Sequence, residues 1–272
     1  MEMRKRIDID GGTRVYTIDL AGKAGVVFGV ANHRSIAWAI AQILHQAGVR
    51  LAIAYQNERV RDTVSALVRD WPDTLLLECD VSKDSNIADA YTRISQEFGS
   101  LDVIIHSVAF ANREDLGGPF VETGRDGFHL AMDVSAYSLV PIARYGVPLI
   151  SQLGGSIVTM TFQASERVFP GYNIMGTAKA ALENEVKQLA ADLGVDNIRV
   201  NAISAGPLDT LSSRAISRYR DMKKAQLERS PMRRNITTEE VAKAALFLCS
   251  DLSSGITGEV VHVDNGYNIM GV

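Results

Sequence analysis

Cysteine is scarce in this chain: Cys79 and Cys249 are the only two among 272 residues, and they lie far apart. This argues against a disulfide framework and favours a reducing compartment. No apolar stretch reaches the 18 or so residues of a membrane span. The basic residues at the start precede no apolar run of the kind that a signal peptide contains. The sequence therefore predicts a cytoplasmic protein with no membrane attachment.

Excess positive charge is also missing, since the net charge is −4 and the isoelectric point about 5.8. This argues against a nucleic-acid partner, which favours a basic face. The five histidines are scattered without ligand spacing, so no metal site is expected. Pro/Ser-rich linkers, low-complexity runs and internal repeats are absent. We therefore expect one domain over residues 19–272, after an N-terminal extension over residues 1–18.

Short apolar runs alternate with helical patterns along the chain. The runs predict strands near residues 24–30, 49–55, 74–78, 101–107, 156–160, 198–204 and 259–263. Helices are expected between them, including a long one from about residue 124 to 151. Continuous apolar strands are typical of a parallel sheet buried on both faces. The predicted fold is α/β: a Rossmann-type, doubly wound, three-layer α/β/α domain with about seven parallel strands.

Ligands of such sheets bind beyond the carboxyl ends of the strands. After the first strand, Gly29 permits a tight turn and close backbone approach. Ser35 stands where it could cap the next helix, whose N-terminal amides would face a pyrophosphate. The strict G-x-G-x-x-G pattern is absent, so an ordinary strand–helix turn is an equal alternative for this stretch.

The next strand ends also contain candidate cofactor contacts. Gln56 follows the second strand, where a dinucleotide fold places the group that reads the ribose. Asp80 follows the third strand and could accept a hydrogen bond from an adenine amino group, or cap the next helix. Ser107, Val108 and Ala109 follow the fourth strand and are small enough for a flat cofactor to lie against the backbone.

Tyr172 and Lys179 lie seven positions apart in GYNIMGTAKAALE, a stretch that we predict to be one helix. Seven residues make about two turns, so both side chains should point to the same side. They could be a proton donor and the charge that makes it more acidic. Surface placement of both is the alternative.

The Tyr-x6-Lys spacing resembles that of the short-chain dehydrogenase/reductase superfamily. Within it, several stretches resemble the enoyl-acyl-carrier-protein reductases of bacterial fatty-acid synthesis: GVANHRSIAWAIAQ, AYQNE, CDVSKDSNI, HSVAF, ERVFPGYNIMGTAKAALE, RVNAISAGPLDTL and FLCSDLSSGITGEVVHVDNG. The resemblance covers about residues 19–268. It implies NAD(P)H-dependent reduction of the double bond of trans-2-enoyl thioesters.

The resemblance also implies a set of site residues. Tyr172 and Lys179 are the catalytic candidates. The cofactor-binding candidates are Gly29, Ala31, Ser35, Ile36, Gln56, Asp80, Val81, Ser107, Val108, Ala109, Lys179, Leu208, Asp209, Thr210, Leu211 and Ser212. The substrate-binding candidates are Ala111, Phe162 and Tyr172. We expect Tyr172 to stabilise the negative charge that develops on the thioester oxygen, and Lys179 to hold the nicotinamide ribose.

Three positions depart from the family pattern. Phe162 stands where many members have a second tyrosine, so it would line the acyl channel or simply pack in the core. Asn265 replaces a glycine near the end, and Ala109 replaces one near the nicotinamide pocket. NADH is expected over NADPH, because Gln56 is neutral and no Arg or Lys occupies positions 56–58 to bind a 2′-phosphate.

The family usually forms homotetramers and acts on acyl-carrier-protein thioesters. Residues 208–230 could form a lid over the substrate. The basic residues there could steer the acidic carrier protein or form a solvated face: Arg214, Arg218, Arg220, Lys223 and Lys224. Two alternative functions stay open. One is a 3-oxoacyl thioester (carbonyl) reductase, with Thr159 at the position of its serine. The other is a non-catalytic dinucleotide-binding regulator.

Overall fold

The computed structural model describes residues 18–150, 153–211, 213, 216 and 218–271. It also places the backbone of two short strands before them, β1 (Ile9–Asp10) and β2 (Thr13–Arg14), which pair antiparallel. No helix in the described part of the chain is long and apolar enough to cross a membrane.

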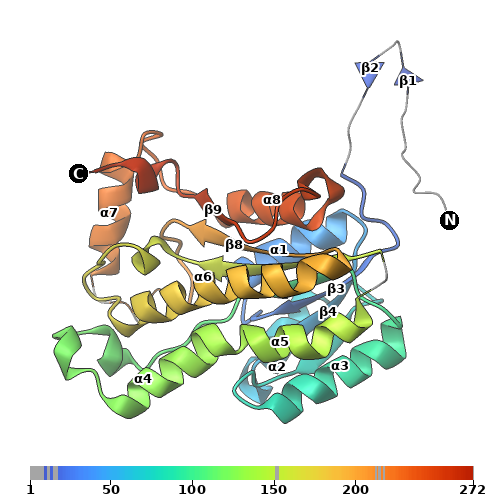
Figure 1. The fold of residues 1–272 in the computed structure, drawn as a ribbon, viewed down its shortest axis with the longest axis horizontal. Coiled ribbons are helices and arrows are strands. Elements are labelled where there is room, and N and C mark those ends of the chain that lie inside the picture. Colours follow the sequence, from blue (N-terminus) through green and yellow to red (C-terminus); the bar gives the residue numbers. More distant parts are fainter. Residues whose placement is uncertain are drawn as a thin grey trace.

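A seven-stranded parallel sheet forms the centre of the molecule (Figure 1). Its strand order is β5-β4-β3-β6-β7-β8-β9. The strands are β3 (Ala24–Phe28), β4 (Arg50–Tyr55), β5 (Leu75–Glu78), β6 (Val103–His106), β7 (Gly155–Thr161), β8 (Ile198–Ala205) and β9 (Val260–Val263). Every strand predicted from the sequence is present, so the predicted fold is confirmed.

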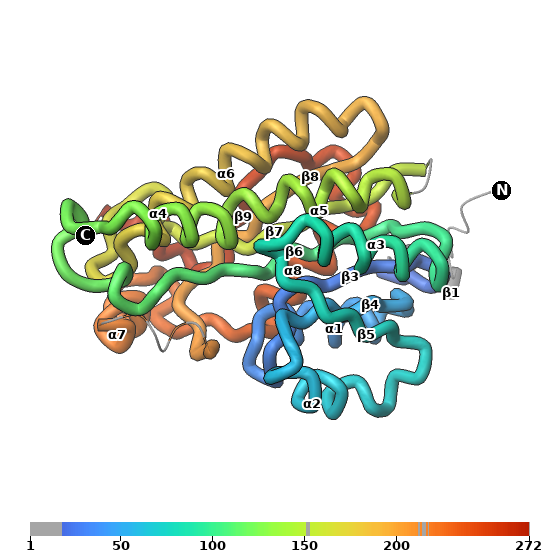
Figure 2. The backbone as a smooth tube through the Cα atoms, turned by 90° about the horizontal axis from the view of Figure 1, so that it is seen from below, coloured from blue at the N-terminus to red at the C-terminus, as the bar shows by residue number. Residues whose placement is uncertain are grey.

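Helices cover both faces of the sheet (Figure 2). They are α1 (Ile36–Gln46), α2 (Glu58–Leu67), α3 (Asp84–Phe98), α4 (Arg125–Met132), α5 (Leu139–Gly146), α6 (Ile174–Leu193), α7 (Tyr219–Arg229) and α8 (Thr238–Cys249). The sheet side chains alternate between two apolar clusters: Val27 packs with α1 and α8, whereas its neighbour Val26 packs with α3, α5 and α6. Burial on both sides explains why the strand sequences are uniformly apolar.

The chain leaves the central strands β3 and β6 in opposite directions along the sheet. β3 is followed by β4 on one side, and β6 is followed by β7 on the other. In doubly wound sheets the ligand crevice opens at such a switch point, beyond the carboxyl ends. Phe28 is paired with both Ala54 and His106, so the turns after these strands begin side by side.

The long helix predicted over residues 124–151 is interrupted. α4 passes into a π-helix (Asp133–Tyr137), in which Ser138 N donates to Asp133 O, before α5 begins. A short 3₁₀ turn (Val147–Leu149) follows α5, and residue 151 lies outside the described residues. Pro141 supplies a physical reason, because it has no N–H to donate to the carbonyl four residues before it.

Candidate active site

The turn after β3 leaves the start of α1 open. Gly29 has φ = 97°, a conformation that favours glycine, and an added Cβ would collide with the Ser107 carbonyl. Ser35 occupies the N-cap position but its hydroxyl does not cap the helix. Instead it accepts hydrogen bonds from the backbone N–H groups of Ala31 (3.2 Å) and Asn32 (3.1 Å). The predicted side-chain cap is therefore wrong.

As a result, the first amides of α1 are available to a ligand. Trp38 N and Ala39 N both donate to the Ser35 carbonyl, whereas the N–H groups of Ile36 and Ala37 meet no acceptor among the described residues. Free amides at the N-terminus of an 11-residue helix suit an anionic group such as a pyrophosphate. This part of the chain fits the cofactor that the sequence predicts.

Gln56 and Asp80 lie at the carboxyl ends of β4 and β5. The Gln56 side chain is exposed. Asp80 accepts hydrogen bonds from the N–H (3.2 Å) and hydroxyl (2.8 Å) of Ser82, and lies 3.3 Å from the Lys83 ammonium. Burial raises the pKa of the Asp80 carboxyl, but Ser82 and Lys83 outweigh that effect and hold the pKa below its usual value. Asp80 is an ionised acceptor that also orders the turn before α3, and Val81 beside it is buried.

The segment after β6 contains the partly buried residues Ser107, Val108 and Ala109 and the nearby substrate candidate Ala111. The Ser135 hydroxyl fixes this segment: it accepts from Phe110 N (2.8 Å) and donates to Phe110 O (2.9 Å). Ser135 belongs to the π-helix. Sequence reasoning missed this contact, because a π turn has no residue signature that separates it from an α-helix.

His106 forms a closed hydrogen-bond network in the core. Its Nδ1 lies 2.7 Å from the Thr159 hydroxyl, and its Nε2 lies 2.9 Å from the Ser138 hydroxyl. Ser138 already donates its proton to Val134 O (2.8 Å), so it accepts from Nε2–H, and Thr159 must then donate to Nδ1. Complete burial, together with the charge of Lys179, lowers the pKa of His106 to about 3, so the ring is neutral.

Tyr172 lies just before α6 and not on it, unlike the prediction. The helix begins at Ile174, and Asn173 interrupts the backbone with φ = 34° and ψ = −119°. A non-glycine residue in this region is strained by about 1–3 kcal/mol. The Asn173 side chain holds the turn by donating to the carbonyls of Gly117 and Gly118, both at 3.1 Å. Asn173 is a second site residue that periodicity could not reveal, since its backbone angles leave no trace in the apolar pattern.

The Tyr172 ring is partly buried and packs against Phe162, with ring centroids 5.0 Å apart. Phe162 in turn contacts Phe169 at 4.7 Å. Burial raises the pKa of the Tyr172 phenol, so the sequence expectation of a more acidic phenol is wrong for this geometry. A phenol that stays protonated retains the hydrogen that a donor needs.

Lys179 is the buried cation of the site, only 4% exposed. Its Nζ donates to Met160 O at 2.8 Å, which fixes the side chain against the end of β7. Burial lowers the pKa of Lys179 to about 8, while the Glu183 carboxylate opposes that shift. One of the three N–H donors is used by Met160, so the others are available to a ligand.

Comparison with known proteins decides which family this arrangement belongs to. A family model described as enoyl-(acyl carrier protein) reductase matches residues 29–268. The NADH-type enoyl-[acyl-carrier-protein] reductase FabI of Bacillus subtilis is 49% identical over 92% of this chain and 97% of its own. The corresponding Bacillus cereus enzyme is 48% identical over 93% of this chain and 99% of its own. The chain belongs to the enoyl-(acyl carrier protein) reductase family.

A solved structure agrees with this result. The crystal structure of the Bacillus cereus enoyl-acyl carrier protein reductase, with NADP+ and indole naphthyridinone, matches with a TM-score of 0.91 and 48% identity. The match covers 93% of this chain and 99% of that chain. The family and fold that we predicted from the sequence are confirmed. The individual site residues stay predictions.

The segment after β8 in this family member is tied to α7. Asp209 lies 2.5 Å from the Lys223 ammonium, and the Tyr219 hydroxyl donates to Leu208 O. Thr210 N donates to the Ser213 hydroxyl at 3.1 Å. The predicted cofactor contact Ser212 lies outside the described residues, whereas Leu208 is buried and Leu211 is exposed.

Most of the predicted basic face in this reductase is neutralised locally. Arg218 pairs with Asp221 at 3.2 Å, and Lys224 pairs with Glu228 at 3.7 Å. Lys223 pairs with Asp209, as above. Arg214 lies outside the described residues. Three of the five predicted basic side chains thus have a carboxylate beside them, which reduces the positive field that this segment presents.

Proposed function

We propose that Tyr172 and Lys179 perform the reaction of this enoyl-acyl-carrier-protein reductase, the reduction of the C2=C3 bond of a trans-2-enoyl thioester. NADH supplies, when bound, the hydride for that bond. Negative charge then grows on the thioester oxygen, and a donor aimed at that oxygen stabilises the transition state. The neutral Tyr172 phenol is our donor. Ala111 and the Phe162 ring are our candidates for contacts with the acyl group.

Lys179 has a different role in this proposal. Its fixed ammonium would hold the nicotinamide ribose hydroxyls, while the amides of Ile36 and Ala37 would hold the pyrophosphate. Gln56 and Asp80 would contact the adenosine end. These groups follow β3, β4, β5 and β7, whose carboxyl ends share one edge of the sheet. The supporting observation is that the Lys179 side chain is buried and fixed to the end of β7.

The position of Thr159 argues against a carbonyl reductase. A 3-oxoacyl reductase would need this hydroxyl to contact the substrate carbonyl. Here Thr159 is fully buried, and its proton is given to His106 Nδ1 at 2.7 Å. The Thr159 hydroxyl therefore belongs to the buried hydrogen-bond network of His106 and Ser138, and has no proton left to donate to a substrate carbonyl.

We expect the protein to oxidise NADH with crotonyl or longer enoyl thioesters and to leave the matching 3-oxoacyl thioesters unchanged. Absorbance at the nicotinamide band gives the rates, and chromatography of the acyl product identifies the bond reduced. Formation of a 3-hydroxyacyl thioester from the 3-oxo substrate, with the enoyl substrate untouched, would show that the proposal is wrong. Cofactor binding without turnover on either substrate would favour the regulator instead.

NADH is the favoured cofactor because none of the three residues that follow β4, Gln56, Asn57 and Glu58, carries a positive charge for a 2′-phosphate. Gln56 is neutral, Asn57 caps α2 by accepting from Arg59 N at 3.1 Å, and Glu58 is anionic. Arg61 is held 3.0 Å from Glu58. The names of the two Bacillus relatives specify NADH, while the Bacillus cereus crystal structure contains NADP+.

We therefore expect kcat/KM to be at least about tenfold higher with NADH than with NADPH, the effect of one unfavourable charged contact of about 1.4 kcal/mol. Steady-state rates with both cofactors at one enoyl concentration test this. As a matched control, Glu58→Gln should free Arg61 from its ion pair. The ratio of kcat/KM with NADH to kcat/KM with NADPH should then become smaller. Equal or higher efficiency with NADPH in the unmodified enzyme would contradict the assignment.

Residues 208–230 are our candidate lid over the acyl chain. The hydrogen bond from Tyr219 to Leu208 and the Lys223–Asp209 pair join α7 to the segment that would lie beside the cofactor. Docking of the acidic carrier protein would rest mainly on Arg220, given the local pairing of its neighbours. A change of KM in Arg220→Ala with carrier-protein substrates but not with coenzyme A substrates tests that role.

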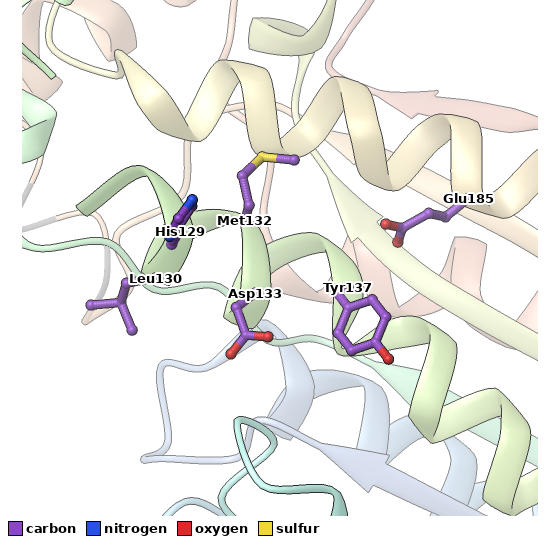
Figure 3. A pocket seen from close by; sticks show the side chains of 6 residues that line it. All are labelled: His129, Leu130, Met132, Asp133, Tyr137 and Glu185. Atoms are coloured by element: carbon purple, nitrogen blue, oxygen red, sulfur yellow. The ribbon is translucent and has the colours of Figure 1, made fainter. Parts of the chain in front are cut away.

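A homotetramer is our proposed assembly. A groove between the α4–π-helix segment and α6 supports it (Figure 3); its lining residues are His129, Leu130, Met132, Asp133, Tyr137 and Glu185. Glu185 Oε2 is buried and meets no partner among the described residues, and burial raises the pKa of this carboxyl to about 7. A second copy of the chain could supply the missing donor. Sedimentation equilibrium tests the assembly, and a monomer would contradict it.

A further inference from the structure

Two charged side chains of α6 face the carboxyl end of β7, one helical turn apart. Lys179 donates to the carbonyl of Met160 at 2.8 Å. Four residues later, Glu183 Oε1 accepts a hydrogen bond from the hydroxyl of Thr161 at 2.6 Å. Met160 and Thr161 are adjacent residues of β7, so the same strand end fixes both side chains. Positions i and i+4 of a helix are neighbours on one face.

The charged form of Lys179 is destabilised by its surroundings. The side chain is 4% exposed and its identified protein partner is a neutral carbonyl. Burial therefore disfavours the ammonium and lowers the pKa of Lys179 to about 8, against an ordinary 10.5. A further loss of stabilisation would leave Lys179 largely neutral at working pH.

Few titratable groups act on this ammonium. His106 on β6 is neutral because its pKa is lowered to about 3, and Tyr172 in the preceding turn is neutral because its pKa is raised. Among the described residues, the negative side chain that stabilises the ammonium is Glu183. The Thr161 hydrogen bond, at 2.6 Å, fixes the direction of a carboxylate that could otherwise rotate toward water.

We propose that Glu183, held in place by Thr161, is a positioning residue that keeps Lys179 in its charged form during the reaction. The inference rests on the proposed function of Lys179. Glu183 touches neither substrate nor cofactor in this scheme, and acts through the ammonium. Neutralising the carboxylate without changing its shape should make Lys179 lose its proton at a lower pH.

The test is the pH dependence of kcat/KM for Glu183→Gln, with NADH and an enoyl thioester, between pH 6 and 10. We expect the alkaline limb to move about one pH unit lower, the size of shift that a nearby opposite charge produces. At pH 6, where Lys179 is charged in both proteins, the rates should agree within about twofold, since a one-unit pKa difference has little effect there. Thr161→Val, which removes the hydroxyl, should move the alkaline limb in the same direction by a smaller amount. Thr161→Ser, which keeps a hydroxyl, should leave the limb at its position in the unmodified protein.

Asp192→Asn is the matched control, since it removes one negative charge from an exposed position of the same helix. Its alkaline limb should coincide with that of the unmodified protein. An unshifted limb in Glu183→Gln, or an equal loss of rate at every pH, would overturn the proposal. Should Glu183→Gln fail to fold, the limb positions of the Thr161 pair decide the question in the same way.

Lys179→Met separates this inference from the proposed function. If Lys179→Met were nearly inactive while the alkaline limb of Glu183→Gln kept its original position, only the role of Glu183 would be overturned. A Lys179→Met protein with the original rate and pH profile would overturn the role of Lys179 itself, and the Glu183 inference with it.

Discussion

Tyr172→Phe is expected to lower kcat by about 10²–10³-fold, the usual effect of removing one donor to a developing oxyanion. The substitution removes a single oxygen and leaves the ring beside Phe162, whose centroid lies 5.0 Å away. Packing and the backbone of the turn should therefore persist. Because the phenol is proposed to act mainly in the transition state, KM and the affinity for NADH should change little.

Single-turnover rates with an acyl-carrier-protein substrate measure this effect, and fluorescence titration with NADH measures cofactor affinity. Phe162→Tyr is a useful companion, since it adds a hydroxyl at the position where many family members have one. If Tyr172→Phe alone retained full activity, the phenol would not be the essential donor. A water molecule or the cofactor ribose would then have to stabilise the thioester oxygen.

Lys179→Met should affect both binding and rate. The substitution keeps an unbranched chain of similar length in the buried site but removes the ammonium. Loss of charged hydrogen bonds, worth about 1.5–3 kcal/mol, should weaken NADH binding by about 10- to 100-fold. Misplacement of the cofactor should lower kcat by a further factor of about 10².

The charge of Lys179 also sets an alkaline limit for the unmodified enzyme. Because burial lowers the pKa of Lys179 to about 8, the charged fraction is high at pH 7 and falls as the pH rises through 8. Activity that depends on the ammonium must fall in the same range. Arginine is the informative control, since Lys179→Arg keeps a positive charge at every pH tested. Normal NADH affinity in Lys179→Met would contradict the proposed contact.

The sequence was sufficient for the fold because its strands are buried on both faces. Runs such as VRLAIAY favour buried parallel strands once helices alternate with them. The order of the strands in the sheet was not predicted and comes from the structure. The regions of the candidate site were predictable for a related reason. They follow strands whose carboxyl ends meet at one edge, so Gly29, Gln56, Ser107 and Phe162 had to lie along it.

The details that were missed depend on where single side chains and backbone groups point, which the apolar periodicity of a sequence does not encode. Ser35 stands at the cap position, but its hydroxyl bonds back to Ala31 and not forward into α1. Tyr172 is excluded from α6 by the backbone angles of a single residue, Asn173. Thr159 stands at the sequence position of the serine of carbonyl reductases, yet its hydroxyl is hydrogen-bonded to His106, 53 residues away in the sequence. Contacts of this kind are visible only after the chain has folded.

The π-helix between α4 and α5 also changes the rotation of α5 about the helix axis relative to α4. In an unbroken α-helix each residue advances by about 100°, so the average direction of Leu139, Ile142 and Gly146 would lie roughly 70° away from that of Gly127 and Ala131. All five are buried. The single wider turn absorbs one residue and so brings the buried residues of the two helices back toward one side, while the ribbons of α4 and α5 run nearly in line (Figure 1). Shortening this segment by one residue would thus rotate one helix on its own axis, and with it the interior face that covers the sheet.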